Sequence, residues 1–282
     1  MSMEILGKRL KFPSKYRVSP YTAPKGKRLK TIAEPSHTIN PIFINESLEE
    51  WNELKDWIED DDQHPPLSVV LMIPDEFEVN RGFFQDLLTC NIWLATYHLD
   101  AITFLLNRDK VAANCTILSP YLVHTIMTKE IGEVKNWAAD KCLTKQDWRS
   151  FERVLLPLNI QNKHWILAEV VLQKKLVRVY DSLKSGRSVF HVRELCDRLP
   201  YLHSLFTMSP LEKEVQPWVA DLVEGVPQQG PGSGECGVMV ASYAEHLLLG
   251  KPLVPGCEYS NMWNKRCQYA VRLWGVKNVD KS

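Results

Sequence analysis

Residues 164–181 read HWILAEVVLQKKLVRVYD, and this stretch decides the fold class. Two runs rich in β-branched residues, 166–172 and 176–180, flank a polar segment at 173–175. Such runs on either side of a short polar segment are typical of a β-hairpin. We therefore expect two antiparallel strands, with His164 and Asp181 near their open end.

His164 and Asp181 can meet across this hairpin. His164 lies ten residues before the centre of the turn, near residue 174, and Asp181 lies seven residues after it. At ~3.3 Å per residue, a modest stagger or bulge brings the carboxylate to the imidazole. A carboxylate in that place would fix the tautomer of the ring and stabilise the imidazolium.

Helical patterns lie on both sides of the hairpin. Apolar spacing predicts helices around 99–106, 120–127, 192–205, 235–249 and 261–274. The order of helices, strands and helices indicates an α+β fold, with a central mostly antiparallel sheet flanked by helices.

Cys236 is the candidate nucleophile. It follows a loop, 225–234, that contains four glycines and two prolines, and it begins a predicted helix. A helix N-terminus and a nearby imidazolium both favour a thiolate. Gly234 and Gly237 leave little bulk beside the sulfur, so a substrate chain could approach it. Backbone N–H groups and an amide from Gln228 or Gln229 could stabilise an oxyanion.

Each of these features alone also has a structural explanation. A histidine on a strand is commonly structural, an aspartate before Ser-Leu can cap a turn, and a buried cysteine packs as a small hydrophobe. The seven cysteines are scattered without a Cys-x-x-Cys pair, which excludes a zinc ribbon or a thioredoxin-like site. The order His, Asp, Gln, Cys, each on the element that its chemistry requires, favours a catalytic site.

The motifs resemble those of the SUMO (ubiquitin-like-protein) proteases, cysteine peptidases of papain-like/adenain-like fold. The resemblance rests on His164-Trp165-Ile-Leu, on Val-Tyr-Asp-Ser-Leu at 179–183, and on Glu235-Cys236-Gly237 with the preceding Gln229. Trp93-Leu94 resembles the segment that opens the catalytic domain of that family, and the similarity spans roughly 83–273. The plant, often transposon-associated, branch is the most similar.

The resemblance implies a role for each matching residue. His164 matches the general base, Asp181 the orienting carboxylate, Cys236 the nucleophile and Gln229 the oxyanion donor, and no metal or organic cofactor is implied. Trp165 and Trp93 match tryptophans that flank a narrow passage for the Gly-Gly tail of the substrate. Flat indoles on both sides admit glycine and exclude a side chain. A purely structural place in the core is the alternative for either ring.

Two positions depart from the family pattern. Glu235 stands where Asp or Asn is usual, and Gln229 lies seven positions before Cys236, where six is usual and falls on Gly230. One extra residue absorbed by the loop 230–232 would restore the geometry with Gln229, which we prefer to Gln228. Without that adjustment, loss of one oxyanion donor costs ~10²–10³ in rate.

Charge is unevenly distributed along the chain. Residues 1–30 contain nine Lys/Arg and one acidic residue, so the remaining 252 carry 25 basic and 33 acidic side chains, a net of −8. We expect a flexible basic arm at 1–40, an extension of helix and strand at 41–82 packed on the catalytic domain, and a ubiquitin-like-protein protease domain at 83–282. The arm is a nuclear-import signal, a nucleic-acid contact or a solvated tail.

The segment 41–82 has its own signals. Ser47 and Glu50 form a capping box before a helical pattern, an acidic run occupies 59–62, and 67–73 has the pattern of a strand. No run approaches the ~18 apolar residues of a membrane span, and the Met1 end has no secretory signal. We expect a nuclear or cytoplasmic protein without membrane contact, and the basic arm favours the nucleus.

The expected function is that of a cysteine-type (iso)peptidase that cleaves after the C-terminal Gly-Gly of a ubiquitin-like protein such as SUMO, free or in conjugates. An alternative is a weakly active or inactive protease-like binding module, associated with chromatin or a transposon. A further alternative is acyl transfer through the same Cys-His pair.

Overall fold

The computed structural model describes residues 48–59, 69–73, 77–134, 147–183 and 188–276. The basic arm, the proposed cap Ser47 and most of the acidic run at 59–62 lie outside these residues. Within the described part of the chain, no helix has both the length and the apolar character needed to cross a membrane.

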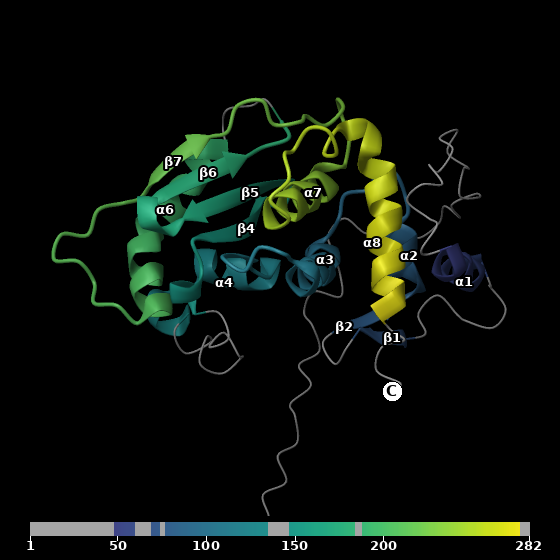
Figure 1. The fold of residues 1–282 in the computed structure, drawn as a ribbon, viewed down its shortest axis with the longest axis horizontal. Coiled ribbons are helices and arrows are strands. Elements are labelled where there is room, and N and C mark those ends of the chain that lie inside the picture. The colour runs from purple at the N-terminus through teal and green to yellow at the C-terminus, as the bar shows by residue number, and fades with distance from the viewer. Residues whose placement is uncertain (1–47, 60–68, 74–76, 135–146, 184–187, 277–282) are drawn as a thin grey trace, which may run out of the picture. The chain divides into compact units, whose positions relative to one another are not determined.

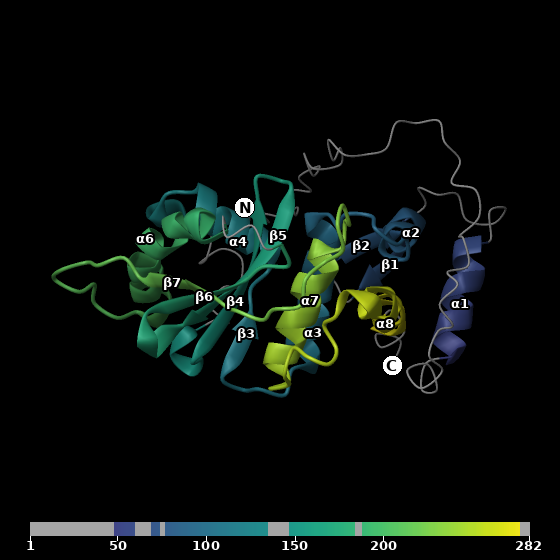
Figure 2. The same ribbon diagram turned by 90° about the horizontal axis from the view of Figure 1, so that it is seen from above.

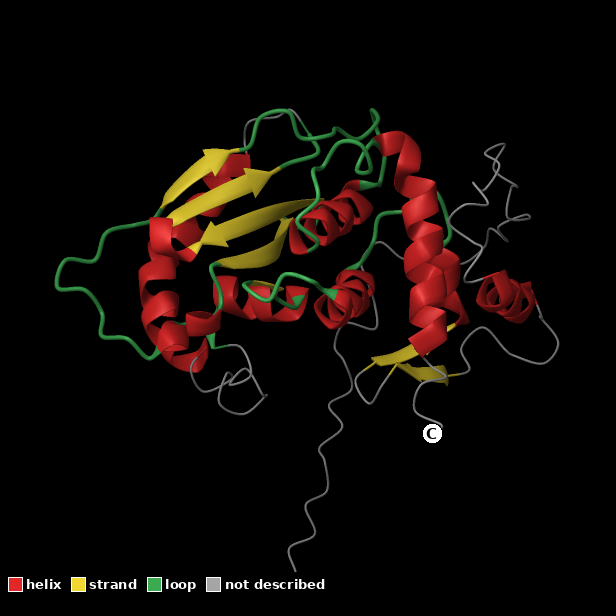
Figure 3. Cartoon of the chain, in the orientation of Figure 1, coloured by secondary structure: helices red, strands yellow, loops and turns green. Residues whose placement is uncertain are grey.

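A five-stranded mixed sheet forms the centre of the fold (Figures 1 and 3). Its order is β3 (Cys115–Ile117), β4 (Arg153–Ile160), β5 (His164–Val171), β6 (Leu176–Tyr180) and β7 (Val219–Leu222). The three middle strands are antiparallel, whereas β3 and β7 join the two edges in parallel. The α+β class is confirmed. The parallel edges were not expected, because strands of three or four residues leave almost no periodic signal.

The hairpin of β5 and β6 is present where the polar segment predicts it. A short 3₁₀ turn, Leu172–Lys174, joins the strands, and Lys175 follows with a φ of 50°. The register pairs Leu167 with Tyr180, so the next position, Asp181, falls opposite Ile166. Asp181 is therefore displaced by two residues from the position opposite His164.

Alternating side chains of the strands enter two cores. Leu156, Ile166 and Val179 pack with helices α4 (Pro120–Thr128) and α6 (Ser188–Thr207) on one face of the sheet. Leu155 and Leu167 pack with α7 (Cys236–Leu248) on the other face. Pleated strands point successive side chains to opposite faces, and these strands are buried on both.

Helix α7 lies inside the protein. It packs on β5, with α3 (Thr96–Asp109) and α8 (Met262–Val276) beyond it, as Figure 2 shows. Twelve of its thirteen residues are buried. A helix that is covered all round is held by the core and not by one amphipathic face.

The remaining described elements pack on α8 or on one another. They are α1 (Leu48–Glu59), the small sheet of β1 (Val69–Ile73) and β2 (Phe77–Asn80), and α2 (Arg81–Leu87). The side chain of Trp57 on α1 contacts the rings of Phe84 and Trp274. The strand expected at 67–73 is thus real, but it belongs to this small sheet.

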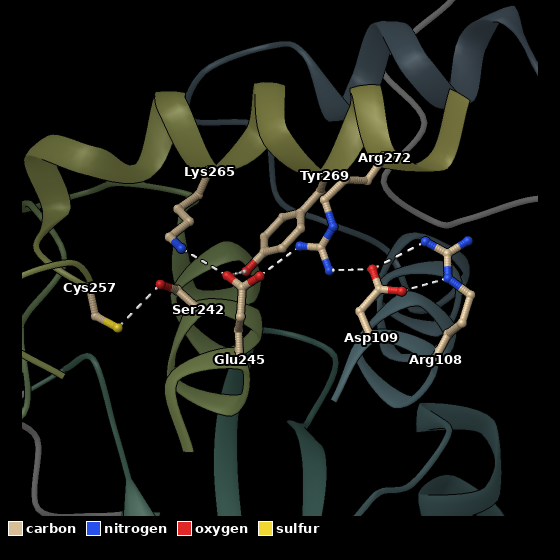
Figure 4. A network of polar contacts seen from close by, with 8 residues as sticks. All are labelled: Arg108, Asp109, Ser242, Glu245, Cys257, Lys265, Tyr269 and Arg272. Atoms are coloured by element: carbon tan, nitrogen blue, oxygen red, sulfur yellow. Dashed lines mark hydrogen bonds and ion pairs between the residues drawn. The ribbon is translucent and has the colours of Figure 1, made fainter. Parts of the chain in front are cut away.

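A polar network centred on the buried side chain of Glu245 joins α7 to its helical neighbours (Figure 4). Glu245 on α7 accepts hydrogen bonds from Lys265 at 2.8 Å, Arg272 at 2.6 Å and Tyr269 at 3.2 Å, all on α8. Arg272 also donates to Asp109 of α3 at 2.9 Å. Burial raises the pKa of Glu245, but Lys265 and Arg272 outweigh this effect and lower it. The ionised carboxylate therefore ties α7 to α8, and Arg272 extends the network to α3.

Candidate active site

His164 and Asp181 lie side by side at the open end of the hairpin. The Nε2 atom of His164 is 2.7 Å from Oδ1 of Asp181, and the N–H of Leu183 donates to the same oxygen at 2.8 Å. Asp181 is buried, while part of the His164 ring remains accessible. The stagger of two residues between the strands is what allows the imidazole to reach the carboxylate.

The pair is charged at neutral pH. Burial raises the pKa of the Asp181 carboxyl, but hydrogen bonds from His164 and from the Leu183 N–H outweigh it and lower that pKa. Burial lowers the pKa of His164, but hydrogen bonds with Asp181 and Cys236 outweigh it and raise the pKa to about 9. The imidazolium is therefore the favoured form of His164 at pH 7.

Cys236 is the first residue of α7 and hydrogen-bonds to His164. Since Nε2 of His164 faces Asp181, the other ring nitrogen, Nδ1, is the one left for the thiol. The thiol thus lies beside the His164 ring and at the N-terminus of α7. His164, Asp181 and Cys236 together can perform nucleophilic catalysis.

The two glycines that flank this thiol serve the protein's own packing. A Cβ at Gly234 would lie 2.2 Å from the backbone oxygen of Asn91, and one at Gly237 would lie 3.0 Å from the Cβ of Leu94. The space that we expected a substrate to use beside these glycines is filled by the segment between α2 and α3. Because Gly234 and Gly237 have no side chain, this segment can pack close to Cys236.

Trp93 and Trp165 stack on each other beside the start of α7, and we call this pair the aromatic wall. Their rings stack with centroids 5.7 Å apart and an angle of 24° between the planes. Trp165 is buried and donates from Nε1 to the backbone oxygen of Leu94 at 2.8 Å. Trp93 is only partly buried. The structure thus brings the two predicted tryptophans together, with Trp165 anchored in the core.

The two glutamines of the loop have different contacts. Nε2 of Gln228 donates to the backbone oxygens of Asp181 at 3.0 Å and Val226 at 2.8 Å. Nε2 of Gln229 donates to the backbone oxygen of Ser233 at 2.9 Å, and its Oε1 accepts from Ser182 at 2.9 Å. Both hydrogens of the Gln228 amide nitrogen are therefore engaged, whereas these contacts use one hydrogen of Gln229.

Residues 92–273 match the model of the Ulp1 protease family, C-terminal catalytic domain. The chain belongs to the Ulp1 protease family. This is a family of cysteine peptidases, and the matched segment contains His164, Asp181 and Cys236. No curated protein matches the chain in sequence.

Solved structures of the Ulp1 family share the fold. SUMO protease Ulp1 with its catalytic cysteine oxidised to a sulfonic acid is 15% identical, with a TM-score of 0.63 over 80% of this chain and 94% of that one. The Ulp1 domain in complex with Smt3, the yeast ortholog of SUMO, is 17% identical, with a TM-score of 0.62 over 80% and 94%. The Ulp1-like SUMO protease domain of Chaetomium thermophilum is 19% identical, with a TM-score of 0.59 over 81% and 92%.

Glu235, the departure from the Ulp1-family pattern, has specific partners. Its Oε2 accepts from Nε of Arg266 at 2.8 Å, and its Oε1 accepts from the backbone N–H of Asn91 at 2.6 Å. The sequence analysis did not identify Arg266 or Asn91. Arg266 lies 30 residues after Cys236 on another helix, and no local pattern distinguishes it from a surface arginine.

Three other cysteines, Cys115, Cys196 and Cys257, are buried. Burial raises the pKa of the thiols of Cys115, Cys196 and Cys257 to about 11. Among the described residues, no group of three His, Cys, Asp or Glu side chains could hold a metal ion. The default of a small buried hydrophobe thus holds for these three cysteines.

Proposed function

We propose that the protein is a cysteine-type (iso)peptidase that cleaves after the C-terminal Gly-Gly of a ubiquitin-like protein such as SUMO. The observation that carries the proposal is the imidazole of His164, held between the Asp181 carboxylate and the Cys236 thiol. Membership of the Ulp1 family supports the reaction. The substrate class is supported by the resemblance of the motifs and by the Ulp1 domain described in complex with Smt3.

In the first step, the Cys236 thiolate attacks the carbonyl carbon of the terminal glycine, and the carbonyl oxygen takes up the negative charge. The His164 imidazolium gives its proton to the leaving amine nitrogen, the C–N bond breaks, and a thioester remains. Asp181 holds the ring of His164 and stabilises its charge throughout.

In the second step, neutral His164 takes a proton from water while the water oxygen attacks the thioester carbonyl. The C–S bond breaks, the free carboxyl terminus of the ubiquitin-like protein leaves, and the thiolate and imidazolium are restored. The chemistry needs no redox partner or cofactor.

Gln229 is the side chain that we assign to the oxyanion. Its amide nitrogen has a hydrogen beyond the one donated to Ser233, whereas Gln228 uses both on Asp181 and Val226. The backbone N–H groups at the start of α7 are the remaining donors. Trp93 and Trp165 would admit the glycines of the substrate and exclude larger residues.

Capture by electrophilic probes tests the proposal. SUMO, a NEDD8-type protein and ubiquitin, each with a C-terminal electrophile, are incubated with the full chain, and the adduct is located by mass spectrometry. We expect a SUMO adduct at Cys236 that the Cys236→Ala variant lacks and that Cys90→Ala retains, because Cys90 is exposed and outside the triad.

Two results would overturn the assignment in different ways. Tight binding of SUMO without an adduct would favour the binding module. Capture of none of the three proteins by a chain whose Cys236 still reacts with iodoacetamide would exclude this substrate class. The plant branch, the nuclear location and a nucleic-acid contact by the basic arm stay predictions from the sequence.

A further inference from the structure

Arg266 is a fully buried arginine that does not belong to the triad. It lies on the second turn of α8, and its guanidinium enters the segment that joins α2 to α3. Nη1 donates to the backbone oxygens of Leu87 at 3.0 Å and Asp86 at 3.3 Å, and Nη2 donates to that of Ile92 at 2.5 Å. One side chain thus bonds the last two backbone carbonyl groups of α2 and one carbonyl group of the segment that follows it.

Glu235 bonds both Arg266 and the segment that follows α2. Its carboxylate receives Nε of Arg266 on one oxygen and the N–H of Asn91 on the other. Asn91 has a φ of 61°, a left-handed conformation that asparagine tolerates better than most residues. The backbone of residues 86–92 is therefore held at both its carbonyl and its N–H groups.

This segment connects the nucleophile to the aromatic wall. Glu235 directly precedes Cys236, and Asn91 lies two residues before Trp93. Trp93 then stacks on Trp165, which is itself anchored to the backbone of Leu94. A change in the position of Asn91 would therefore move Trp93 relative to the thiol.

We infer that the Arg266–Glu235 ion pair is a positioning element that sets Trp93 against Trp165 and so shapes the passage to Cys236. The part of this inference that concerns the passage rests on the proposed function. Neither residue touches the reacting atoms. Their role is to hold the wall at the distance from the nucleophile that a glycine tail requires.

The chemistry of the pair explains why these two residue types are used. The guanidinium is a planar fork that can bond a carboxylate and several carbonyl oxygens at once, which an ammonium group cannot do. Glutamate has the length to reach both Arg266 and Asn91 from a helix N-cap position. Removal of one partner alone would leave a buried charge, so the neutral double variant is the cleaner test.

The experiment compares Arg266→Met, Arg266→Lys and the double variant Glu235→Gln/Arg266→Met with wild type. The matched control is Arg272→Met, which removes an ion-paired arginine six residues further along the same helix, where its partners are Glu245 and Asp109 (Figure 4). Three quantities are measured. The first is kcat and KM for a SUMO precursor, and the second is the rate at which iodoacetamide alkylates Cys236. The third is the far-UV exciton signal of the stacked Trp93 and Trp165 rings, which is identified by its loss in Trp93→Phe.

We expect Arg266→Met and the double variant to lose the exciton signal and ~10²-fold in kcat/KM, since a displacement of about 1 Å has an effect of that size. Alkylation of Cys236 should stay near the wild-type rate, because a small reagent needs the Cys-His pair and not the wall. Arg266→Lys should restore part of kcat/KM, and Arg272→Met should match wild type in all three measurements.

A folded double variant with wild-type kcat/KM and an intact exciton signal would overturn the inference. So would a loss of alkylation in parallel with kcat/KM, because the pair would then act on the triad itself. If wild type hydrolyses no precursor while the exciton signal still depends on Arg266, the proposed function fails and the positioning of Trp93 stands.

Discussion

At the scale of single residues, His164 sets the pH dependence of the site. Its pKa of about 9 results from hydrogen bonds with Asp181 and Cys236 that outweigh the effect of burial. The ring is therefore an imidazolium over most of the physiological range. Activity that depends on this form should decrease as the pH rises through about 9.

Asp181→Asn should reduce kcat by up to ~10⁴-fold, because a neutral amide neither stabilises the imidazolium nor fixes the tautomer. The pKa of His164 should also decrease toward its ordinary value, which NMR titration of the ring can measure. A variant with nearly wild-type kcat would assign the orienting role to another group.

The raised pKa of His164 should also make the stability of the folded protein depend on pH. The pKa of His164 is raised from 6.5 to about 9 in the folded protein, so its contribution is complete below pH 6.5 and is lost as the pH rises through about 9. We expect the midpoint of urea denaturation to decrease between these values. In Asp181→Asn that decrease should be smaller, and an equal decrease would show that another group titrates.

At the scale of elements, the contact between α7 and the segment 88–95 depends on a glycine. A Cβ at Gly234 would lie 2.2 Å from a backbone oxygen of Asn91, which cannot rotate away as a side chain would. The N-terminus of α7 and the wall that carries Trp93 can approach each other only because this position has no side chain.

Gly234→Ala should therefore destabilise the protein by about 1–3 kcal/mol, the usual effect of an atom forced into a packed interior. Gly275→Ala is the matched control, because its Cβ would meet nothing within 4 Å and alanine is the better helix former. Chemical denaturation measures both variants. Equal stability of the two would contradict the close contact at Gly234.

At the scale of the whole chain, charge is divided between two regions. Residues 1–30 carry nine basic side chains and one acidic one, and the remainder has a net charge of −8. Any affinity for nucleic acid should then depend on the arm. Phosphate binding of this kind weakens steeply as salt increases.

Replacing the nine Lys/Arg of residues 1–30 with Gln should abolish salt-dependent retention on heparin, while probe capture at Cys236 continues. Elution from a heparin column along a salt gradient measures the effect. Unchanged retention would place the basic surface elsewhere in the chain.

The sequence was sufficient for features that have local patterns. The polar segment 173–175 predicted the hairpin, and the glycine-rich loop before Cys236 predicted the start of α7. The parallel edge strands and the Arg266–Glu235 pair were missed. Both depend on contacts between residues far apart in the chain, and a buried arginine on an amphipathic helix has the sequence pattern of an exposed one.

The burial of α7 also determines how the geometry around Cys236 should be lost on unfolding. A helix covered on nearly every side has no solvent-exposed face from which to fray, so its amide hydrogens should exchange with deuterium only when the surrounding core opens. The nucleophile would then keep its orientation until global unfolding. Heat or denaturant should abolish catalysis in the same transition that melts the sheet, with no earlier partly active state.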